Sequence, residues 1–460
     1  MNRNELRERL YQKYIAPTLA RKGKFVGIEI EMPVANLEGR ATDYAVAQAA
    51  AAKFRERFGF VEEARDVNGV CYSATCPATG DNLSFDCAYN NMEFSFGKAT
   101  SLAEPWARFQ EYVAFLNGEL ARHGHLLTGM GVNPNRELNR KDYIPSERYR
   151  MLERYLQKFE DWDVPLFRYH GYPDYAAFCS ASQVQLDVAC TELLETLHVN
   201  ALAEPLKAVL FSNSVLPTEP SLLCVRDMMW EHSTHGINPH NIGAFEAEPE
   251  SVDDLLEYIL GTSIFCTMRS GRYVCFYPVP VAEYFALDSV TGETFNGEAW
   301  EKITFKPEAG DLKYLRTYKF EDLTFRGTIE FRSACSQPFS STMSVAAFHM
   351  GLKENSKKIL ELLRNDKVLY HHGYSASELR KILNKRTWPN FIERSGLTKL
   401  CLAVLDLAGE GLKKLGQGDE RFLEPLYRRA ETLTSPARHL VDELEKGVPM
   451  RELVLEFAKF

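Results

Sequence analysis

The sequence predicts an α+β protein in which an antiparallel β-sheet is followed by a helical region. Three features of the 460-residue chain indicate this fold. Strand patterns are separated by amphipathic helical patterns, glycine-rich turns of the kind found in doubly wound sheets are few, and only helices are predicted after residue 340. We therefore expect residues 1–340 to contain the sheet and residues 341–460 to be helical.

Strands are predicted where short apolar or alternating runs end in turn residues. The first run begins near Phe25 and reaches Pro33. The other strands are expected at 69–75, 82–97, 126–132, 178–189, 272–281 and 323–333. Helices with a 3.6-residue apolar period are expected at 4–22, 42–58, 101–123, 147–159, 191–213, 252–260, 340–365, 377–384, 398–415 and 420–445.

The composition argues against several classes of protein. The net charge is −9 and no face or tail concentrates lysine and arginine, so no nucleic-acid partner is expected. No apolar run approaches membrane-spanning length and the first residues lack a signal-peptide pattern, so we expect no membrane association and a cytoplasmic location. The ten cysteines form no C-x-x-C pair and are expected to be thiols, not disulfides or zinc ligands.

Two glutamates interrupt the apolar run of the first strand. Glu29 and Glu31 are two residues apart, and a strand sends residues i and i+2 to the same face, so their carboxylates lie side by side. Like charges in this position repel unless a cation lies between them or the face is open to water. A metal site and a solvated acidic face are both open at this point.

Three further strand patterns contain acids or amides among apolar residues. They are Asp86 with Glu93, then Gln183, Gln185 and Asp187, and finally Glu330 with Arg332. A sheet face with several carboxylates suits a hard divalent cation, typically Mg²⁺, which can also hold phosphate oxygens. Arg332 shares a face with Glu330 and can bind a carboxylate or phosphate, or the two residues can form a plain ion pair.

Other chemistries have weaker support. Gly and Pro interrupt the segment of His232, His235 and His240, which disfavours the helix that His-x-x-His zinc ligation uses. The chain has no P-loop and no G-x-S-x-G nucleophile motif. The acidic strands are therefore the candidate site.

Seven segments in order resemble one known family, the glutamate–cysteine ligases of the plant and proteobacterial type, within the glutamine-synthetase-like carboxylate–amine ligases. The segments begin at Gly27 (GIEIEM), Met92 (MEFS), Gly129 (GMGVNP), Ser182 (SQVQLD), Leu210 (LFSNS), Val225 (VRDMMW) and Gly327 (GTIEFRS). The resemblance covers residues 20–340 and implies a curved, funnel-shaped antiparallel sheet flanked by helices. Residues 1–340 would be the catalytic carboxylate–amine ligase domain, with the helical region 341–460 packed on it.

The resemblance also implies roles for particular residues. Two or three Mg²⁺ ions would lie on Glu29, Glu31, Glu93 and Glu330. Arg332 and Arg226 would be catalytic. Substrate or ATP would be bound by Gln185, Asp187, Asn133 and Asp86, where Asn133 replaces a metal-ligand histidine found in some members.

The activity implied by the resemblance is an ATP-dependent ligation. Glutamate and cysteine would give γ-glutamylcysteine through a γ-glutamyl phosphate, which is the first step of glutathione biosynthesis, in a monomer or homodimer. Two alternatives stay open: a γ-glutamyl ligase with another amine acceptor, and a non-catalytic binding protein on the same fold. Loss of catalysis would normally remove a matched Glu or Arg, and all of these are present.

Overall fold

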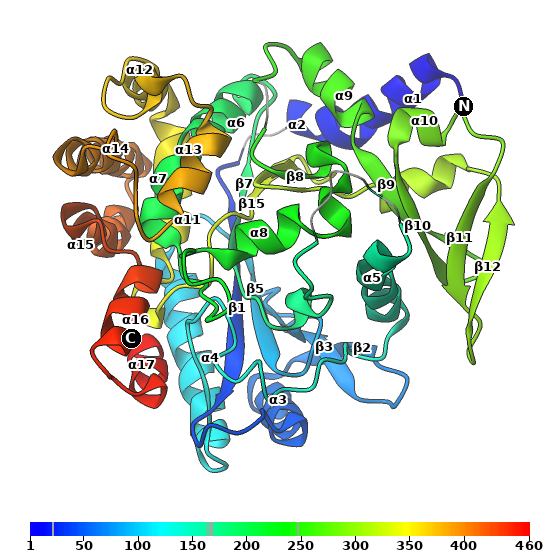
Figure 1. Ribbon diagram of the computed structural model, residues 1–460, viewed down its shortest axis with the longest axis horizontal. Helices are drawn as coiled ribbons and strands as arrows, with labels where there is room; N and C mark the ends of the chain where they lie inside the picture. The colour runs from blue at the N-terminus through cyan, green and yellow to red at the C-terminus, as the bar shows by residue number, and fades with distance from the viewer. Residues whose placement is uncertain (21–22, 163, 165–168, 246–247) are drawn as a thin grey trace.

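The computed structural model describes residues 1–20, 23–162, 164, 169–245 and 248–460 (Figure 1). Its central sheet has nine strands in the order β14-β15-β7-β1-β5-β4-β3-β2, with β6 paired to the end of β1. They are β1 (Val26–Asn36), β2 (Val61–Arg65), β3 (Cys71–Thr75), β4 (Asn82–Phe85), β5 (Asn91–Ala99), β6 (His125–Leu127), β7 (Ser182–Asp187), β14 (Glu321–Leu323) and β15 (Thr328–Phe331). Every pair is antiparallel, which confirms the predicted fold class.

The register gives this sheet two unlike faces. Ile28 of β1 lies between Val184 of β7 and Phe96 of β5, and all three are buried. Helices cover this apolar face, namely α3 (Tyr44–Phe58), α4 (Ala103–Ala121) and α11 (Ser344–Glu354). The residues between the apolar ones point to the opposite face and are mostly polar.

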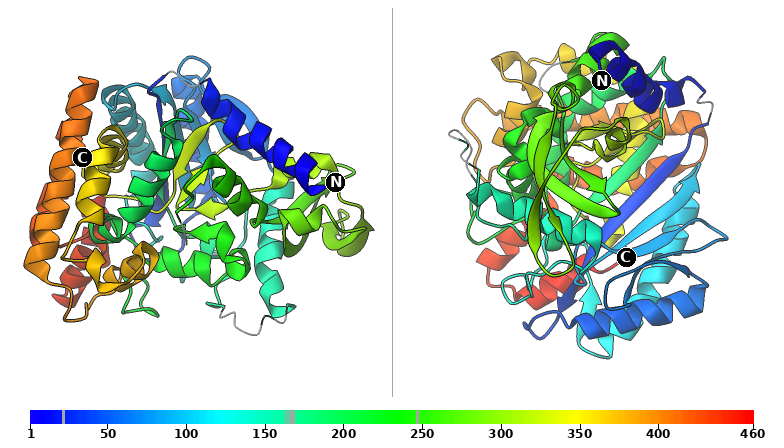
Figure 2. Two further views of the ribbon diagram at one scale, coloured as in Figure 1. Left: turned by 90° about the horizontal axis from the view of Figure 1, so that it is seen from above. Right: turned by 90° about the vertical axis from the view of Figure 1, so that its right-hand side faces the viewer.

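A second antiparallel sheet, in the order β12-β11-β10-β9, lies on the side of the molecule away from the C-terminal helices (Figure 2). Its strands are β9 (Ser263–Arg269), β10 (Arg272–Pro280), β11 (Val290–Phe295) and β12 (Trp300–Phe305). Helix α5 (Glu147–Gln157) packs against β10. A short parallel pair joins β8 (Ile242–Gly243) to β13 (Tyr318–Lys319).

The predicted helical character of residues 341–460 is confirmed. After α11 come α12 (Ser356–Arg364), α13 (Ala376–Leu383), α14 (Arg394–Leu415), α15 (Glu424–Thr432), α16 (Pro436–Glu445) and α17 (Met450–Phe457). Helix α14 packs along α11, which itself packs against β1 and β7, and one continuous hydrophobic cluster draws on both parts of the chain. The division at residue 340 stays a prediction.

The remaining helices precede this region. They are α1 (Arg3–Leu10), α2 (Ala16–Leu19), α6 (Leu193–Leu202), α7 (Glu204–Phe211), α8 (Val225–Glu231), α9 (Val252–Leu260) and α10 (Val281–Tyr284). Residues 21–22, at the end of the predicted helix 4–22, lie outside the described residues. Within the described ranges, no helix is long and apolar enough to cross a membrane.

Several predicted elements are divided in the structure, and three of them have a reason that can be seen in the backbone. The predicted strand 82–97 is a hairpin of β4 and β5, whose turn places Cys87 at a φ of 58°. The predicted strand 323–333 contains the turn between β14 and β15, where Gly327 has a φ of 71° that suits glycine. The predicted helix 191–213 is α6 followed by α7, because Pro205 has no N–H with which to continue the α6 hydrogen bonds.

Candidate active site

Four adjacent strands, β15, β7, β1 and β5, bring polar side chains to one face of the central sheet. The register pairs residues across neighbouring strands, Glu330 with Gln185, Glu29 with Gln183, and Glu31 with Glu93. Because side chains alternate along a strand, these residues lie on the face opposite α4 and α11. The sheet order therefore joins four patterns that are far apart in the sequence.

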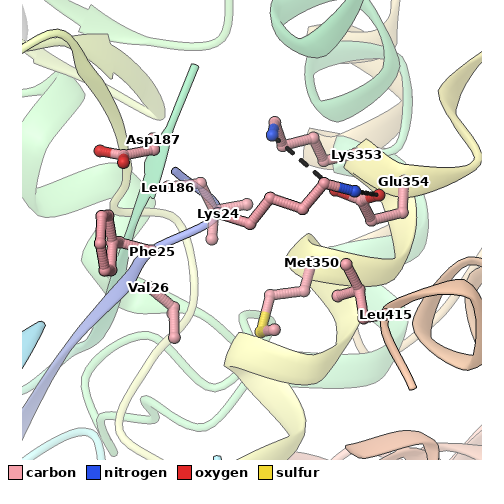
Figure 3. A pocket seen from close by; sticks show the side chains of 9 residues that line it. All are labelled: Lys24, Phe25, Val26, Leu186, Asp187, Met350, Lys353, Glu354 and Leu415. Carbon is pink, nitrogen blue, oxygen red and sulfur yellow. Dashed lines mark hydrogen bonds and ion pairs between the residues drawn. The ribbon is translucent and has the colours of Figure 1, made fainter. Parts of the chain in front are cut away.

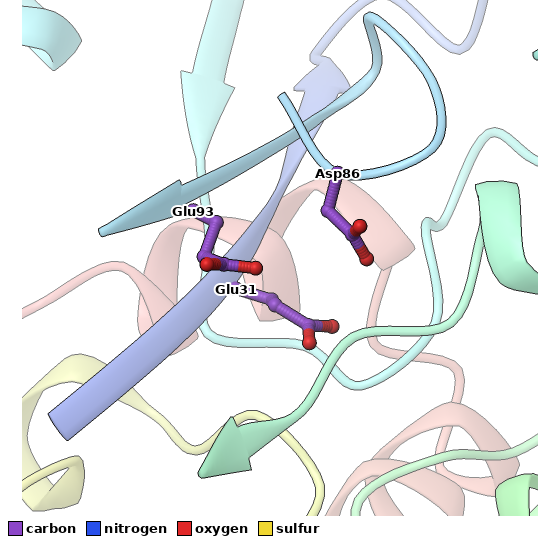
Figure 4. A group of neighbouring side chains, drawn as sticks. All are labelled: Glu31, Asp86 and Glu93. Atoms are coloured by element: carbon purple, nitrogen blue, oxygen red, sulfur yellow. The ribbon is translucent and has the colours of Figure 1, made fainter. Parts of the chain in front are cut away.

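Glu31, Asp86 and Glu93 form a close group on this face (Figure 4). One carboxylate oxygen from each residue lies within 4.8 Å of the other two. Asp86 comes from the turn after β4, whereas the two glutamates come from strands. The backbone N–H of Ala181 and the side-chain amide of Gln183 donate to Glu31 at 2.7 and 2.9 Å. Uncharged donors thus hold Glu31 in place.

The other two acids of this group also accept from uncharged donors. The hydroxyl of Ser95 donates to Glu93 at 2.8 Å, and that of Tyr149 donates to Asp86 at 3.3 Å. Such donors fix carboxylate positions without neutralising them. The group therefore keeps its capacity to bind a cation.

A second group is centred on Arg332, which directly follows β15. Its guanidinium donates to Glu330 at 2.5 Å and to Gln183 at 2.8 Å. The amide of Gln185 donates to Glu29 at 3.0 Å and to Glu330 at 3.3 Å. The two glutamines link the strands and hold Arg332 beside the acids.

Burial raises the pKa values of the acids on this face, and neighbouring carboxylates raise them further. Burial and then the charge of Asp86 raise the pKa of Glu31 to about 8. Burial and then Glu330 raise the pKa of Glu29 to about 7. The pKa of Glu93 is raised well above its usual range by burial and the charge of Glu29. Near neutral pH the face therefore holds protons unless a cation takes their place.

This set of donors fits a hard divalent cation. Carboxylate oxygens are the ligands that Mg²⁺ prefers, and the excess negative charge is what such an ion would neutralise. Asp86, predicted to contact substrate or ATP, lies with Glu31 and Glu93. Glu29 and Glu330, also predicted as metal ligands, lie in the Arg332 group.

Two predicted site residues donate hydrogen bonds to main-chain carbonyl groups. Arg226, on α8, donates to the carbonyl oxygens of Ala334 and Arg332 at 3.2 and 3.3 Å, and so holds the segment after β15. Asn133 is buried and donates to the carbonyl oxygens of Val34 and Asn90 at 3.4 and 3.3 Å. Asn133 thus ties β1 to the β4–β5 turn.

Asp187 lies two residues beyond Gln185, where β7 approaches α11. It is buried beside a small pocket that Lys24, Phe25 and Glu354 also line (Figure 3). Lys24 and Glu354 form an ion pair across this pocket at 2.5 Å. The structure therefore places Asp187 next to the helices and at the margin of the acidic face.

The sequence interpretation missed Asp322, which lies on β14 opposite Glu330. It accepts a 2.5 Å hydrogen bond from Thr317 and lies 3.8 Å from Nε of Arg332. Burial raises its pKa to about 6. The predicted strand began at residue 323, so Asp322 was assigned to a loop. Gly327 was the available signal, because a glycine turn at this position predicts a separate strand before it, which contains Asp322.

Fold and site together define an α+β protein whose antiparallel sheet gathers carboxylates and an arginine on one face. Residues 25–455 match the family described as Glutamate-cysteine ligase family 2 (GCS2), and the chain belongs to this family. The resemblance inferred from the seven segments is confirmed.

Individual relatives are distant. The chain is 22% identical over 328 residues to a chloroplastic glutamate–cysteine ligase of Brassica juncea, covering 68% of this chain and 57% of the relative. It is 21% identical over 331 residues to that of Medicago truncatula, covering 68% and 58%. The chain thus spans less than two thirds of these plant relatives. A glutamate–cysteine ligase structure from Francisella tularensis, in complex with AMP, has a TM-score of 0.51 at 10% identity and covers 96% of this chain and 88% of that one, which shows a shared fold.

Proposed function

We propose that this protein is an ATP-dependent ligase that joins the γ-carboxylate of L-glutamate to the amine of L-cysteine. The proposal rests mainly on the convergence of Glu31, Asp86 and Glu93 within 4.8 Å, beside Arg332. Family membership and the names of the plant relatives support the two amino acids as substrates. AMP in the Francisella tularensis structure supports the use of an adenine nucleotide.

The acidic face needs cations for this role, because ATP and both amino acids are anions or carry carboxylates. Glu29, Glu31, Glu93 and Glu330, together with Asp86, would hold two or three Mg²⁺ ions. Bound Mg²⁺ would neutralise phosphate charge during phosphoryl transfer. Binding requires ionised carboxylates, so these residues would release their protons as the metal enters.

The residues of the chain would position the reactants and stabilise charge. The γ-carboxylate of glutamate attacks the γ-phosphorus of ATP, and the bond to the bridging oxygen of ADP breaks. Arg332, held by Glu330 and Gln183, would bind the transferred phosphoryl group. The cysteine amine then attacks the acyl carbon, phosphate leaves with the C–O electron pair, and the amine loses a proton. Arg226 keeps the main chain next to Arg332 in place.

ADP release tests this proposal. We expect purified protein with ATP and Mg²⁺ to release ADP steadily when both glutamate and cysteine are present, and to stop when EDTA removes the metal. Mass spectrometry should detect γ-glutamylcysteine in the same samples. Steady ADP release without an amine, or none with any amino acid, would contradict the proposal.

The acceptor amine needs its own test, because identity to the named plant ligases is only 22%. A screen of amines in the same assay, with products identified by mass, separates cysteine from another acceptor. A non-catalytic protein would bind ATP without product in any sample. Monomeric or homodimeric state, cytoplasmic location and the separate domain 1–340 stay predictions.

A further inference from the structure

A cavity of about 150 Å³ lies among the helices on the apolar side of the central sheet. Its walls come from Trp106 on α4, from the start of α11, and from the segment that leads into α15. Trp106 packs on Phe109, which packs on Phe96 of the apolar face, so the cavity lies across the sheet from the acidic face. It opens to solvent at Ser340 and Arg421, which are both exposed. A cavity of this volume can hold a small ligand.

Three arginines surround this cavity. Arg421 and Arg428 line it, and Arg429 donates to the hydroxyl of Ser341, another lining residue, at 2.7 Å. Among the described residues, neither Arg421 nor Arg429 has a carboxylate within ion-pair distance. Burial raises the pKa of Asp419, and the charge of Arg421 offsets part of this rise from beyond that distance. Two of the three guanidinium groups therefore lack a direct counter-charge.

The acids of this region do not balance the arginines. Glu424 is the one acid among the described lining residues, and it pairs with Arg428 at 2.5 Å across one turn of α15. Asp419 and Glu420 precede Arg421 but do not line the cavity. Burial and then the charge of Arg428 lower the pKa of Arg429 to about 9. The cavity therefore keeps an excess of positive charge.

The first turn of α11 adds uncharged donors to the same cavity. Met343 is the residue that caps this eleven-residue helix, and no side chain caps its first N–H groups. Unpaired N–H groups and the helix dipole make such a helix start favourable for an anion. Ser344 and the exposed Ser340 also line the cavity. Two distant parts of the chain thus supply arginines and a helix start to one place.

This set of donors fits a phosphate group. A cation is excluded by the arginines, and a charged, polar lining disfavours an apolar molecule. Arginine binds phosphate through parallel hydrogen bonds, and helix starts bind phosphate through their N–H groups. A phosphate group has oxygens enough to accept from both walls at once, whereas a carboxylate would satisfy one arginine.

We propose that this cavity binds the phosphate group of a small anion between Arg421, Arg428 and the start of α11. The anion is either free phosphate or a small phosphate ester. The site is distinct from the proposed ligation, because it lies across the sheet from the acidic face and needs no metal. Binding would join α15 to α11, which packs against β1 and β7.

Calorimetric titration in EDTA at constant ionic strength tests the proposal with two probes, inorganic phosphate and glycerol 3-phosphate. We expect at least one probe to bind wild-type protein saturably, with a Kd of roughly 1 mM or lower. The probe that binds more tightly identifies the source of the phosphate group. In the double variant R421Q/R428Q, affinity should fall roughly tenfold to a hundredfold, because charge-assisted hydrogen bonds are lost. E424Q should bind more tightly than wild type, since it removes a carboxylate that competes for Arg428.

Two control variants accompany the test. R122Q removes an exposed arginine that pairs with Glu119 of α4, and E93Q changes the acidic face. Both should bind the probes as wild type does. Because Arg421 and Arg428 are exposed, R421Q/R428Q should unfold at the wild-type temperature, so its loss of affinity reports binding.

Three results would overturn the proposal. The first is that neither probe binds wild-type protein saturably. The second is that R421Q/R428Q binds as tightly as wild type. The third is that E93Q loses binding, which would place the phosphate group on the acidic face.

Discussion

Two clusters of acids among the described residues are balanced in opposite ways. One is Glu31, Asp86 and Glu93 on the sheet face. The other contains Glu204 and Asp227. Glu204 accepts hydrogen bonds from Lys207 and Arg380, each at 2.7 Å. Burial alone would raise the pKa of Glu204, but these two cations lower it to about 2. The pKa of Glu31, in contrast, is raised to about 8.

The partners of Glu204 and Glu31 show which buried charges stabilise the fold. Around Glu204 the chain supplies its own cations, and Arg380 also pairs with Asp227 at 2.8 Å and donates to the carbonyl oxygen of Ser333 at 3.2 Å. Around Glu31 the hydrogen-bond donors are uncharged, and arginine charges act on the group without a direct ion pair to Glu31. Glu31 and Glu204 are both buried, so the direct ion pairs of Glu204, which Glu31 lacks among the described residues, distinguish the network that holds the fold from the proposed cation site.

Removing a cation from the Glu204 network should give the largest loss of stability. We expect R380M to lower the free energy of unfolding by about 3–5 kcal/mol, because Asp227 would lose its cation and Glu204 would lose one of its two. Urea denaturation measures this loss, and R380K is the matched control with the charge retained. An R380M protein as stable as wild type would mean that the network is not structural.

Removing an acid from the sheet face should affect activity instead. We expect E93Q to lower kcat at least about a hundredfold, because a proposed cation ligand is lost. Its free energy of unfolding should stay equal or rise, since repulsion with Glu31 and Asp86 is relieved. A marked loss of stability in E93Q would mean that Glu93 stabilises the fold, as the Glu204 network does.

Added Mg²⁺ should stabilise the protein through the sheet face alone. At a hundred times its Kd, a ligand adds about 2.7 kcal/mol to the free energy of unfolding. We expect a rise of this order for wild-type protein and R380K, and a much smaller rise for E93Q, in thermal denaturation with and without EDTA. An equal response in E93Q would place the metal elsewhere.

Glu31 and Glu204 should also respond oppositely to pH when no metal is present. The raised pKa of Glu31 means that the folded state binds more protons than the unfolded state between 4.5 and about 8, so its contribution to stability falls as pH rises through this window. The lowered pKa of Glu204 gives stability above 4.5 that is lost as pH falls toward 2. Denaturation in EDTA at pH 5.5, 7 and 8.5 should show the first trend in wild type and a weaker one in E31Q.

The sequence predicted which polar residues share a face within each strand. It did not predict which strands lie side by side and bring these residues together. Side-chain alternation is local, so the shared face of Glu29 and Glu31 follows from two positions alone. The order β15-β7-β1-β5 depends on distant pairing that no local pattern records. Asp86 belongs to a turn, and only the three-dimensional structure shows that it lies against Glu31 and Glu93.

Polar residues that bind the main chain were the hardest to interpret. Arg226 and Asn133 were predicted as site residues from the family resemblance, and their roles in the site stay predictions. Their partners are carbonyl oxygens far along the chain, and any residue type can supply a carbonyl.

The hydrogen bonds from Arg226 to the segment after β15 have a consequence for how this site can change in evolution. Arg226 recognises carbonyl oxygens at Arg332 and Ala334, which are the same whatever side chain stands there. The backbone path at position 332 is therefore insensitive to the residue it presents. New side chains can be tried at this point without rebuilding the sheet, which makes position 332 a natural place for one scaffold to acquire a new preference.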